Sequence, residues 1–245
     1  MSKRLNRDLL KFLVIIPMTL SHFGDIFLVK ESFNDFSVWF FVWNVIGNLT
    51  APVMCVLMAK GYEYTRNPWK YALRVACFAL ISYISHAWSH DNWSIFGLNM
   101  FFTFSLGLIA VICYDKIQNK ALRWICILAI MVVSALCEWP FTTILWLVSF
   151  YAFRNDPKKK LLTGIVIYGG QVVVLSYLWH EKLGAPWKFC IPYHIMIWGV
   201  VAFALWLAIY VCNGKRGKHP VAMKWFFYLY YPIHFAVFGL FKYIL

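Results

Sequence analysis

Charged residues are scarce in this chain of 245 residues, where they make up 13% of the sequence. Soluble proteins contain about 25% charged residues. Hydrophobic residues make up 62% and form continuous runs along the whole chain, with no linker long enough for a separate soluble domain. This composition excludes an ordinary soluble protein and predicts an all-α, polytopic membrane protein with one domain over residues 1–245. Continuous runs, rather than short alternating segments, also exclude a membrane β-barrel.

Motifs of soluble enzymes are missing as well. The chain contains no G-x-S-x-G, P-loop, H-E-x-x-H or G-x-G-x-x-G motif. Its acidic residues form no block, so we expect no metal site. The seven cysteines show no C-x-x-C and no paired spacing, which indicates free thiols within the membrane. No small-residue cleavage signature follows the first apolar run, so we expect a retained helix rather than a removed signal peptide.

The apolar runs predict the number of membrane-spanning helices. A spanning helix needs about 20 apolar residues. Nine runs fit: residues 9–29, 36–59, 71–88, 94–114, 121–137, 139–153, 161–179, 189–212 and 223–244. If the fifth and sixth of these form a re-entrant pair, seven full spans remain and the sidedness is unchanged.

Basic residues predict how these helices are oriented. The formal net charge is +13, and connections rich in Lys and Arg alternate with connections that are poor in them. Under the positive-inside rule this alternation places the N-terminus in the cytoplasm and the C-terminus outside. The basic clusters are explained by anionic lipid headgroups, so membrane lipids are the expected partner and nucleic acid is not.

Polar residues inside the apolar runs indicate where a site lies. With the sidedness above, most of them fall in the outer half or the middle of the membrane. They predict an outward-biased polar cavity inside a helix bundle, where such residues bind substrate or relay protons. His86, His90, His180 and His194 fit interfacial belt residues better. The cavity candidates are His22, Asn48, Asn99, Thr103, Glu138 and His234.

Two histidines of this set have neighbours that suggest a role. Asp25 follows His22 by three residues, so its carboxylate can share the helical face and orient the imidazole of a general base. A solvated helix end explains Asp25 equally well. His234 lies in the middle of the last run, with Tyr230 one turn earlier as its expected hydrogen-bond partner. A kinked structural helix with a buried histidine is the alternative there.

Basic residues gather in the connection after the second run. Lys60, Arg66, Lys70 and Arg74 could together hold the phosphates of a nucleotide-type cofactor. Positive-inside anchoring explains the same residues, and composition alone favours that explanation.

Five further stretches follow one another along nearly the whole chain. They are residues 46–55 (IGNLTAPVMC), 61–67 (GYEYTRN) with 70–74 (KYALR), 99–108 (NMFFTFSLGL), 213–217 (NGKRG) and 224–234 (KWFFYLYYPIH). Together and in this order they resemble the TraX family of pilin N-acetylases.

The resemblance implies a multi-helix acetyltransferase of the bacterial cytoplasmic membrane. It implies acetyl-CoA from the cytoplasm as donor and an amine or hydroxyl, such as a peptide N-terminus, as acceptor. Peptide-export or pilus machinery is the implied partner. The family's helix-1 histidine matches His22, its Tyr-Pro-x-His matches Tyr231 to His234, and its acidic residue at an outer junction matches Glu138.

Three positions depart from the family pattern. Ser21 stands where the family usually has Asp, Asn48 where it has Arg, and Lys60 where it has an acidic residue. Each change removes or reverses a charge at the expected site, although Asp25 could replace the missing acid. The leading hypothesis is acyl transfer with His22, Asp25 and His234 in catalysis. A transporter or flippase, and an inactive scaffold of an export system, stay open as alternatives.

Overall fold

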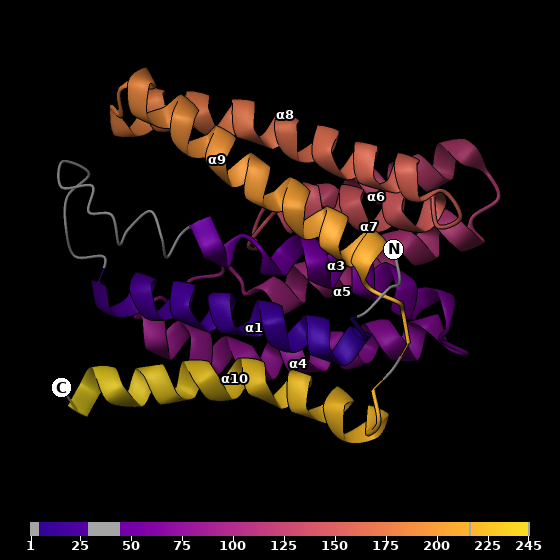
Figure 1. Ribbon diagram of the computed structural model, residues 1–245, viewed down its shortest axis with the longest axis horizontal. Helices are drawn as coiled ribbons and strands as arrows, with labels where there is room; N and C mark the ends of the chain where they lie inside the picture. Colours follow the sequence, from indigo (N-terminus) through magenta and orange to yellow (C-terminus); the bar gives the residue numbers. More distant parts are fainter. Residues whose placement is uncertain (1–4, 29–44, 216, 245) are drawn as a thin grey trace. The chain divides into compact units, whose positions relative to one another are not determined.

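The computed structural model describes residues 5–28, 45–215 and 217–244. Within these ranges the secondary structure is helical, apart from two isolated β-bridges that pair Leu5 with Cys212 and Leu98 with Cys137. The helices shown in Figure 1 are α1 (Arg7–Phe23), η1 (Gly24–Leu28), α3 (Thr50–Glu63), α4 (Pro68–His90), α5 (Met100–Lys116), α6 (Lys120–Ser134), α7 (Thr142–Ala152), α8 (Pro157–Leu183), α9 (Trp187–Trp206), η2 (Leu207–Val211) and α10 (Pro220–Ile244).

Asparagine and aspartate side chains explain where many of these helices begin. Each accepts a hydrogen bond from a backbone amide of the first turn, which would otherwise lack a partner. A proline at the first helical position follows the cap of α4 and of α8. The capping residues are Asn6, Asn67, Asn99, Asn119 and Asp156.

The prediction of a helical membrane protein is confirmed. Each of the nine expected runs overlaps a helix, although the first part of the 36–59 run lies outside the described residues. Four described segments are both long and apolar enough to span: Arg7–Leu28, Val45–Glu63, Pro157–Lys182 and Trp187–Val211. By contrast, α7 has 11 residues, and at 1.5 Å per residue it is about 16 Å long. Nine spans and the orientation of the termini stay predictions.

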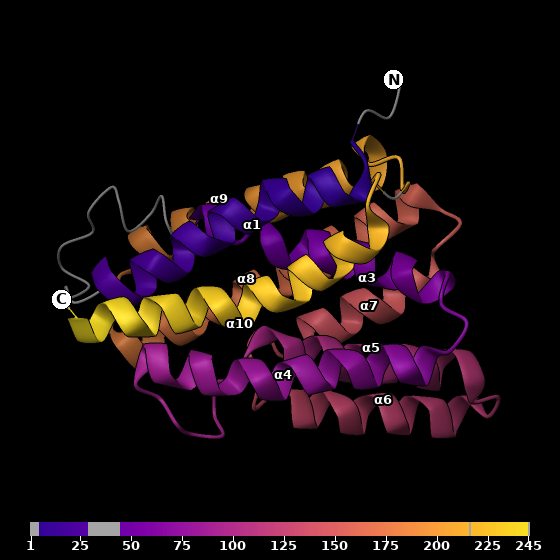
Figure 2. The same ribbon diagram turned by 90° about the horizontal axis from the view of Figure 1, so that it is seen from below.

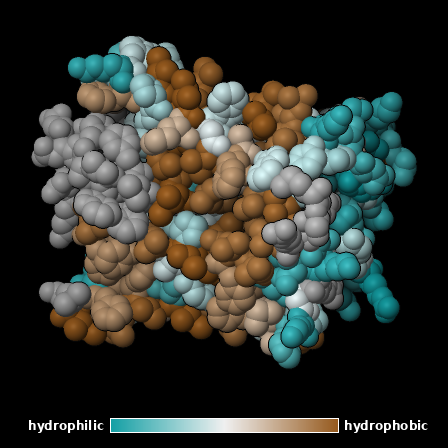
Figure 3. Space-filling view, in the orientation of Figure 1, coloured by the Kyte–Doolittle hydropathy of each residue, from teal (hydrophilic) through white to brown (hydrophobic). Residues whose placement is uncertain are grey.

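Burial follows the pattern of a protein whose solvent is lipid. Large apolar side chains are exposed along the helices, among them Leu80 at 62% and Val132 at 71%. Figure 3 shows broad apolar surface on the face that it draws. Polar side chains such as Ser82, Asn99 and Thr143 are fully buried instead. A bilayer cannot satisfy polar groups, so they turn inward.

The chain divides into two compact units. The first unit is Met1–Met54 with Asn155–Lys215, and the second unit is Cys55–Arg154 with Arg216–Leu245. In the first unit α8 packs on α9. In the second unit α4 packs between α5 and α10, and α5 also packs on α6 and α7. The single domain expected over residues 1–245 stays a prediction.

The pairing of α4 with α10 positions the site described below. The two helices run parallel and side by side (Figure 2). Near their starts Arg74 Nε donates to Tyr228 Oη at 3.3 Å, and near their ends Lys242 Nζ donates to Asp91 Oδ2 at 2.5 Å. Between these contacts the α10 backbone approaches α4 so closely that a Cβ at Gly239 would overlap the ring of Trp88. The sidedness predicted from the basic residues has α4 and α10 cross the membrane in the same direction, and their parallel packing agrees with that prediction.

Candidate functional site

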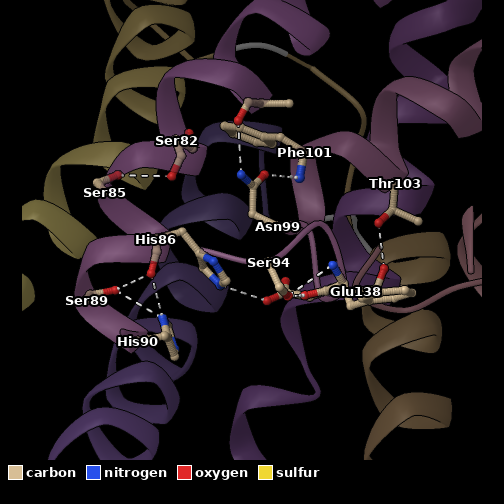
Figure 4. A network of polar contacts seen from close by, with 12 residues as sticks. Ser82, Ser85, His86, Ser89, His90, Ser94, Asn99, Phe101, Thr103 and Glu138 are labelled. Carbon is tan, nitrogen blue, oxygen red and sulfur yellow. Dashed lines mark hydrogen bonds and ion pairs between the residues drawn. The ribbon is translucent and has the colours of Figure 1, made fainter. Parts of the chain in front are cut away.

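Polar side chains converge in the second unit, at the end of α4 that points towards the α4–α5 loop. They come from the last turns of α4, the first turn of α5 and the turn between α6 and α7 (Figure 4). The middle of α10 packs against the same place through Phe235, whose ring lies 4.9 Å from that of His86. Four segments from three separate regions of the sequence therefore build one site.

The centre of the site is a hydrogen bond between His86 and Glu138. His86 Nε2 lies 3.1 Å from Glu138 Oε1, and the two side chains are 9% and 28% exposed. A carboxylate only accepts hydrogen bonds, so Nε2 carries the proton and Nδ1 has the lone pair. Within the described residues the ring of His86 bonds to Glu138 through Nε2. The imidazole is thus oriented from that side.

The turn that carries Glu138 is held in place by its backbone. The Glu138 amide donates to the carbonyl of Leu98 at 2.8 Å, and Thr103 Oγ1 donates to the Glu138 carbonyl at 2.5 Å. The next residues include Trp139 and Phe141 with φ of +52° and +57°. Such a conformation costs about 1–3 kcal/mol per non-glycine residue and persists where its surroundings impose it. The two hydrogen bonds therefore hold the turn from which the Glu138 side chain extends.

Asn99 joins this turn to α4. Its Oδ1 accepts from the amide of Phe101, which caps α5, and its Nδ2 donates to the carbonyl of Ala79 at 3.0 Å. Asn99 and Thr103 are both fully buried. Their polar groups bind the protein's own backbone, so in this structure they position the site. The prediction that they contact substrate is untested.

Three imidazoles surround the ring of Phe235, which is fully buried. His234, His86 and His90 have ring centroids 4.1, 4.9 and 5.5 Å from its own. His234 Nδ1 donates to the backbone carbonyl of Tyr230 at 3.1 Å. The expected partnership with Tyr230 is therefore present, but through its carbonyl, while its ring stacks on the imidazole at 5.5 Å.

Sequence reasoning missed the importance of His86. The interpretation of His86 as an interfacial belt residue is wrong, because the side chain is buried and paired with Glu138. The ring of His90 lies 4.4 Å from that of His86, tilted by 31°, and His90 is half-buried. The spacing of four residues, which places both rings on one face of α4, was the signal that could have found them.

The other predicted catalytic and substrate-binding residues, His22, Asp25 and Asn48, lie in the first unit. His22 is in the last turn of α1 and Asp25 in the π-helical turn that continues it. Asn48 Oδ1 accepts from Tyr168 Oη at 3.4 Å. A Cβ at Gly47 would overlap Ser21, so the backbone before Asn48 passes directly beside α1. The expected meeting of His22 with His234 stays a prediction.

The four predicted cofactor-binding cations lie at the opposite end of α4, where they differ in their contacts. Lys60 forms an ion pair with Glu63 at 2.7 Å. Arg74 lies over the rings of Tyr71 and Tyr228. Arg66 and Lys70 are exposed. Lys60 and Arg74 are thus already engaged by the protein.

Comparison with known proteins gives two matches. A family described as TraX protein matches residues 6–242 of this chain. The probable fimbrial assembly protein FimC, serogroup H1, of Dichelobacter nodosus is 27% identical over 237 residues, which cover 93% of this chain and 92% of that protein. No solved structure matches the chain. The resemblance noted in the sequence motifs is confirmed.

Proposed function

Since the chain belongs to the TraX family, we propose that it is a membrane acyltransferase. It moves an acetyl or short acyl group from cytoplasmic acetyl-CoA to an amine or hydroxyl acceptor. The observation that supports this most is the hydrogen bond between His86 and Glu138, which lies inside a helical unit with apolar outer surfaces. A histidine oriented by a carboxylate is the usual general base for activating an amine or hydroxyl.

The pair acts on the proton of the acceptor. His86 Nδ1 takes that proton as the acceptor attacks the acyl carbon, and Glu138 stabilises the imidazolium through Nε2–H. Burial strengthens this interaction, because the dielectric constant around the pair is lower than in water. His90 and His234 pack on the same phenyl ring, and they hold the geometry of His86.

The donor enters from the other end of α4. Arg66 and Lys70 are the exposed cations there, and they are suited to the phosphates of CoA. Arg74 and His86 are twelve residues apart on one helix, which corresponds to about 18 Å along its axis. An extended donor bound by its phosphates would direct its thioester along α4 towards His86.

The relative's name suggests an acceptor. FimC is described as a probable fimbrial assembly protein. A peptide N-terminus of a fimbrial or pilus subunit, met in the membrane or outside it, is therefore the acceptor that we propose. Pilus or export machinery would be the partner of the chain.

The decisive experiment measures transfer of radiolabelled acetyl groups from acetyl-CoA in vesicles containing the purified protein. The probe acceptor is a synthetic peptide with one free N-terminal amine. His86→Ala should lower the rate by about 10²–10⁴-fold, the usual contribution of a general base. His219→Ala is the matched control, because His219 is exposed and lies outside the site.

The same assay separates the alternatives. His22→Ala tests the other candidate base, which Asp25 would assist. A large loss with His22→Ala and none with His86→Ala would move the base to α1. Wild-type protein that binds acetyl-CoA but transfers nothing to any amine or hydroxyl would favour an inactive scaffold.

A further inference from the structure

Tyr231 carries a buried hydroxyl that the scheme above does not use. The residue is 6% exposed and lies in the middle of α10. Its ring packs against Phe101 at 4.5 Å and Phe235 at 5.2 Å, so its direction is fixed. Among the described residues its hydroxyl makes no hydrogen bond of ordinary geometry. A buried donor left without a partner is costly, and such groups commonly face a ligand.

The ring that carries the hydroxyl lies beside the first turn of α5, because its centroid is 4.5 Å from that of Phe101. Asn99 accepts from the amides of Phe101 and Phe102, through its side chain and its carbonyl. The amide of Met100, the first residue of α5, belongs to the same turn beside Tyr231. A helix N-terminus carries a partial positive charge that stabilises an anion.

We propose that Tyr231 and the N-terminus of α5 form the oxyanion site of the acyl transfer. This inference rests on the proposed function and adds to it the residue that binds the acyl carbonyl. Preorganised donors at the position where negative charge develops give one of the largest contributions to catalysis. Tyr231 donates to the carbonyl oxygen, and the Met100 amide adds to the positive potential there.

The order of groups along α10 fits this assignment. Tyr228 contacts Arg74 near the donor end, Tyr231 follows one turn later, and Phe235 contacts His86 beyond it. The oxyanion site thus lies between the donor end and the base. A thioester that arrives from the cytoplasmic end meets Tyr231 before it meets His86.

The reaction step balances without a further reagent. The acceptor nitrogen forms a bond to the acyl carbon, and the carbonyl electrons move to oxygen, where Tyr231 donates a hydrogen bond and keeps its proton. His86 Nδ1 takes one proton from the nitrogen. The carbonyl then re-forms, the carbon–sulfur bond breaks, and the sulfur takes the proton that His86 held, so that CoA leaves as the thiol and His86 is neutral again.

Tyr231→Phe removes the hydroxyl and keeps the ring that packs on Phe101 and Phe235. We expect kcat to fall by about 10²–10³-fold, as for the loss of one oxyanion donor. KM for acetyl-CoA and the midpoint of the pH profile should stay at their wild-type values, because the donor end and His86 are intact. Tyr177→Phe is the control, since Tyr177 is 55% exposed. An unchanged kcat in Tyr231→Phe, with His86→Ala inactive, would overturn the oxyanion site and leave the proposed function standing.

A second measurement does not depend on turnover. With 3-fluorotyrosine placed at position 231, the fluorine resonance should shift when acetonyl-CoA, an unreactive ketone analogue of acetyl-CoA, is added. CoA without the carbonyl group should produce no such shift. A shift in protein that shows no transfer would keep the carbonyl-binding site and reject the proposed function. The absence of a shift would reject the site itself.

Discussion

Two replacements of Glu138 distinguish its two effects on His86, namely the hydrogen bond that orients the imidazole and the negative charge beside it. The hydrogen bond from His86 Nε2 to the carboxylate is 3.1 Å long. A hydrogen bond to a charged group contributes about 1.5–3 kcal/mol, and about 1.4 kcal/mol corresponds to tenfold in rate. Glu138→Ala should therefore lower acetyl transfer by roughly 10- to 150-fold. Glu138→Gln keeps an acceptor for Nε2–H and loses only the charge, so we expect a loss of about tenfold.

The assay is the transfer of labelled acetyl groups in vesicles, combined with thermal unfolding of each purified variant in detergent. The backbone contacts of Glu138 to Leu98 and Thr103 remain in both variants. The free energy of unfolding should therefore change by no more than about 3 kcal/mol, the upper value for one hydrogen bond to a charged group. Equal, wild-type rates in both variants would refute the role of the pair. A rate for Glu138→Gln below that for Glu138→Ala would refute the argument about orientation.

Three further predictions concern packing, pH and the donor. Gly239→Ala should lower the free energy of unfolding by about 1–2 kcal/mol, since overpacking against α4 outweighs the gain in helix propensity. Gly170→Ala is the control and should raise that free energy, because nothing lies within 4 Å of the new methyl group. Equal shifts of the thermal midpoint in the two variants would contradict the described α4–α10 contact. Hydrogen bonds from Lys242 and from the neighbouring tyrosine hydroxyl lower the pKa of the Asp91 carboxyl. Its stabilisation is therefore complete above the ordinary carboxyl pKa of about 4 and is lost as the pH falls through the lower folded value, so wild type should lose its thermal advantage over Lys242→Met in acid. Arg66→Ala should raise KM for acetyl-CoA several-fold at constant kcat, and an unchanged KM would remove Arg66 from the donor site.

The position of the helices was largely predictable from local sequence. Continuous apolar runs predicted each helical segment, because a chain in lipid must satisfy its backbone hydrogen bonds within the segment. Their ends were less predictable. The 139–153 run, for example, forms a helix of 11 residues only from Thr142 onward. Hydropathy assigns residues 139–141 to this helix, but in the structure they belong to the turn that carries Glu138.

The site was predictable in its residue types and only partly in its arrangement. Asn99, Thr103 and Glu138 were predicted as polar cavity residues, and the structure places them together. His86 was assigned to the membrane interface because hydropathy gives a depth and no direction around the helix axis. The partner of a side chain lies on another helix, so its identity depends on which faces meet.

The sequence by itself determined that this chain is a helical membrane protein of the TraX family, because apolar length and ordered motifs are properties of contiguous residues. Only the tertiary structure decided that His86 pairs with Glu138 and that the Tyr231 ring packs against Phe101 at the start of α5. Residues 86 and 138 are 52 positions apart. Their contact arises from the packing of α4, α5 and α10 and from the turn after α6. Helical periodicity within one segment carries no information about that packing.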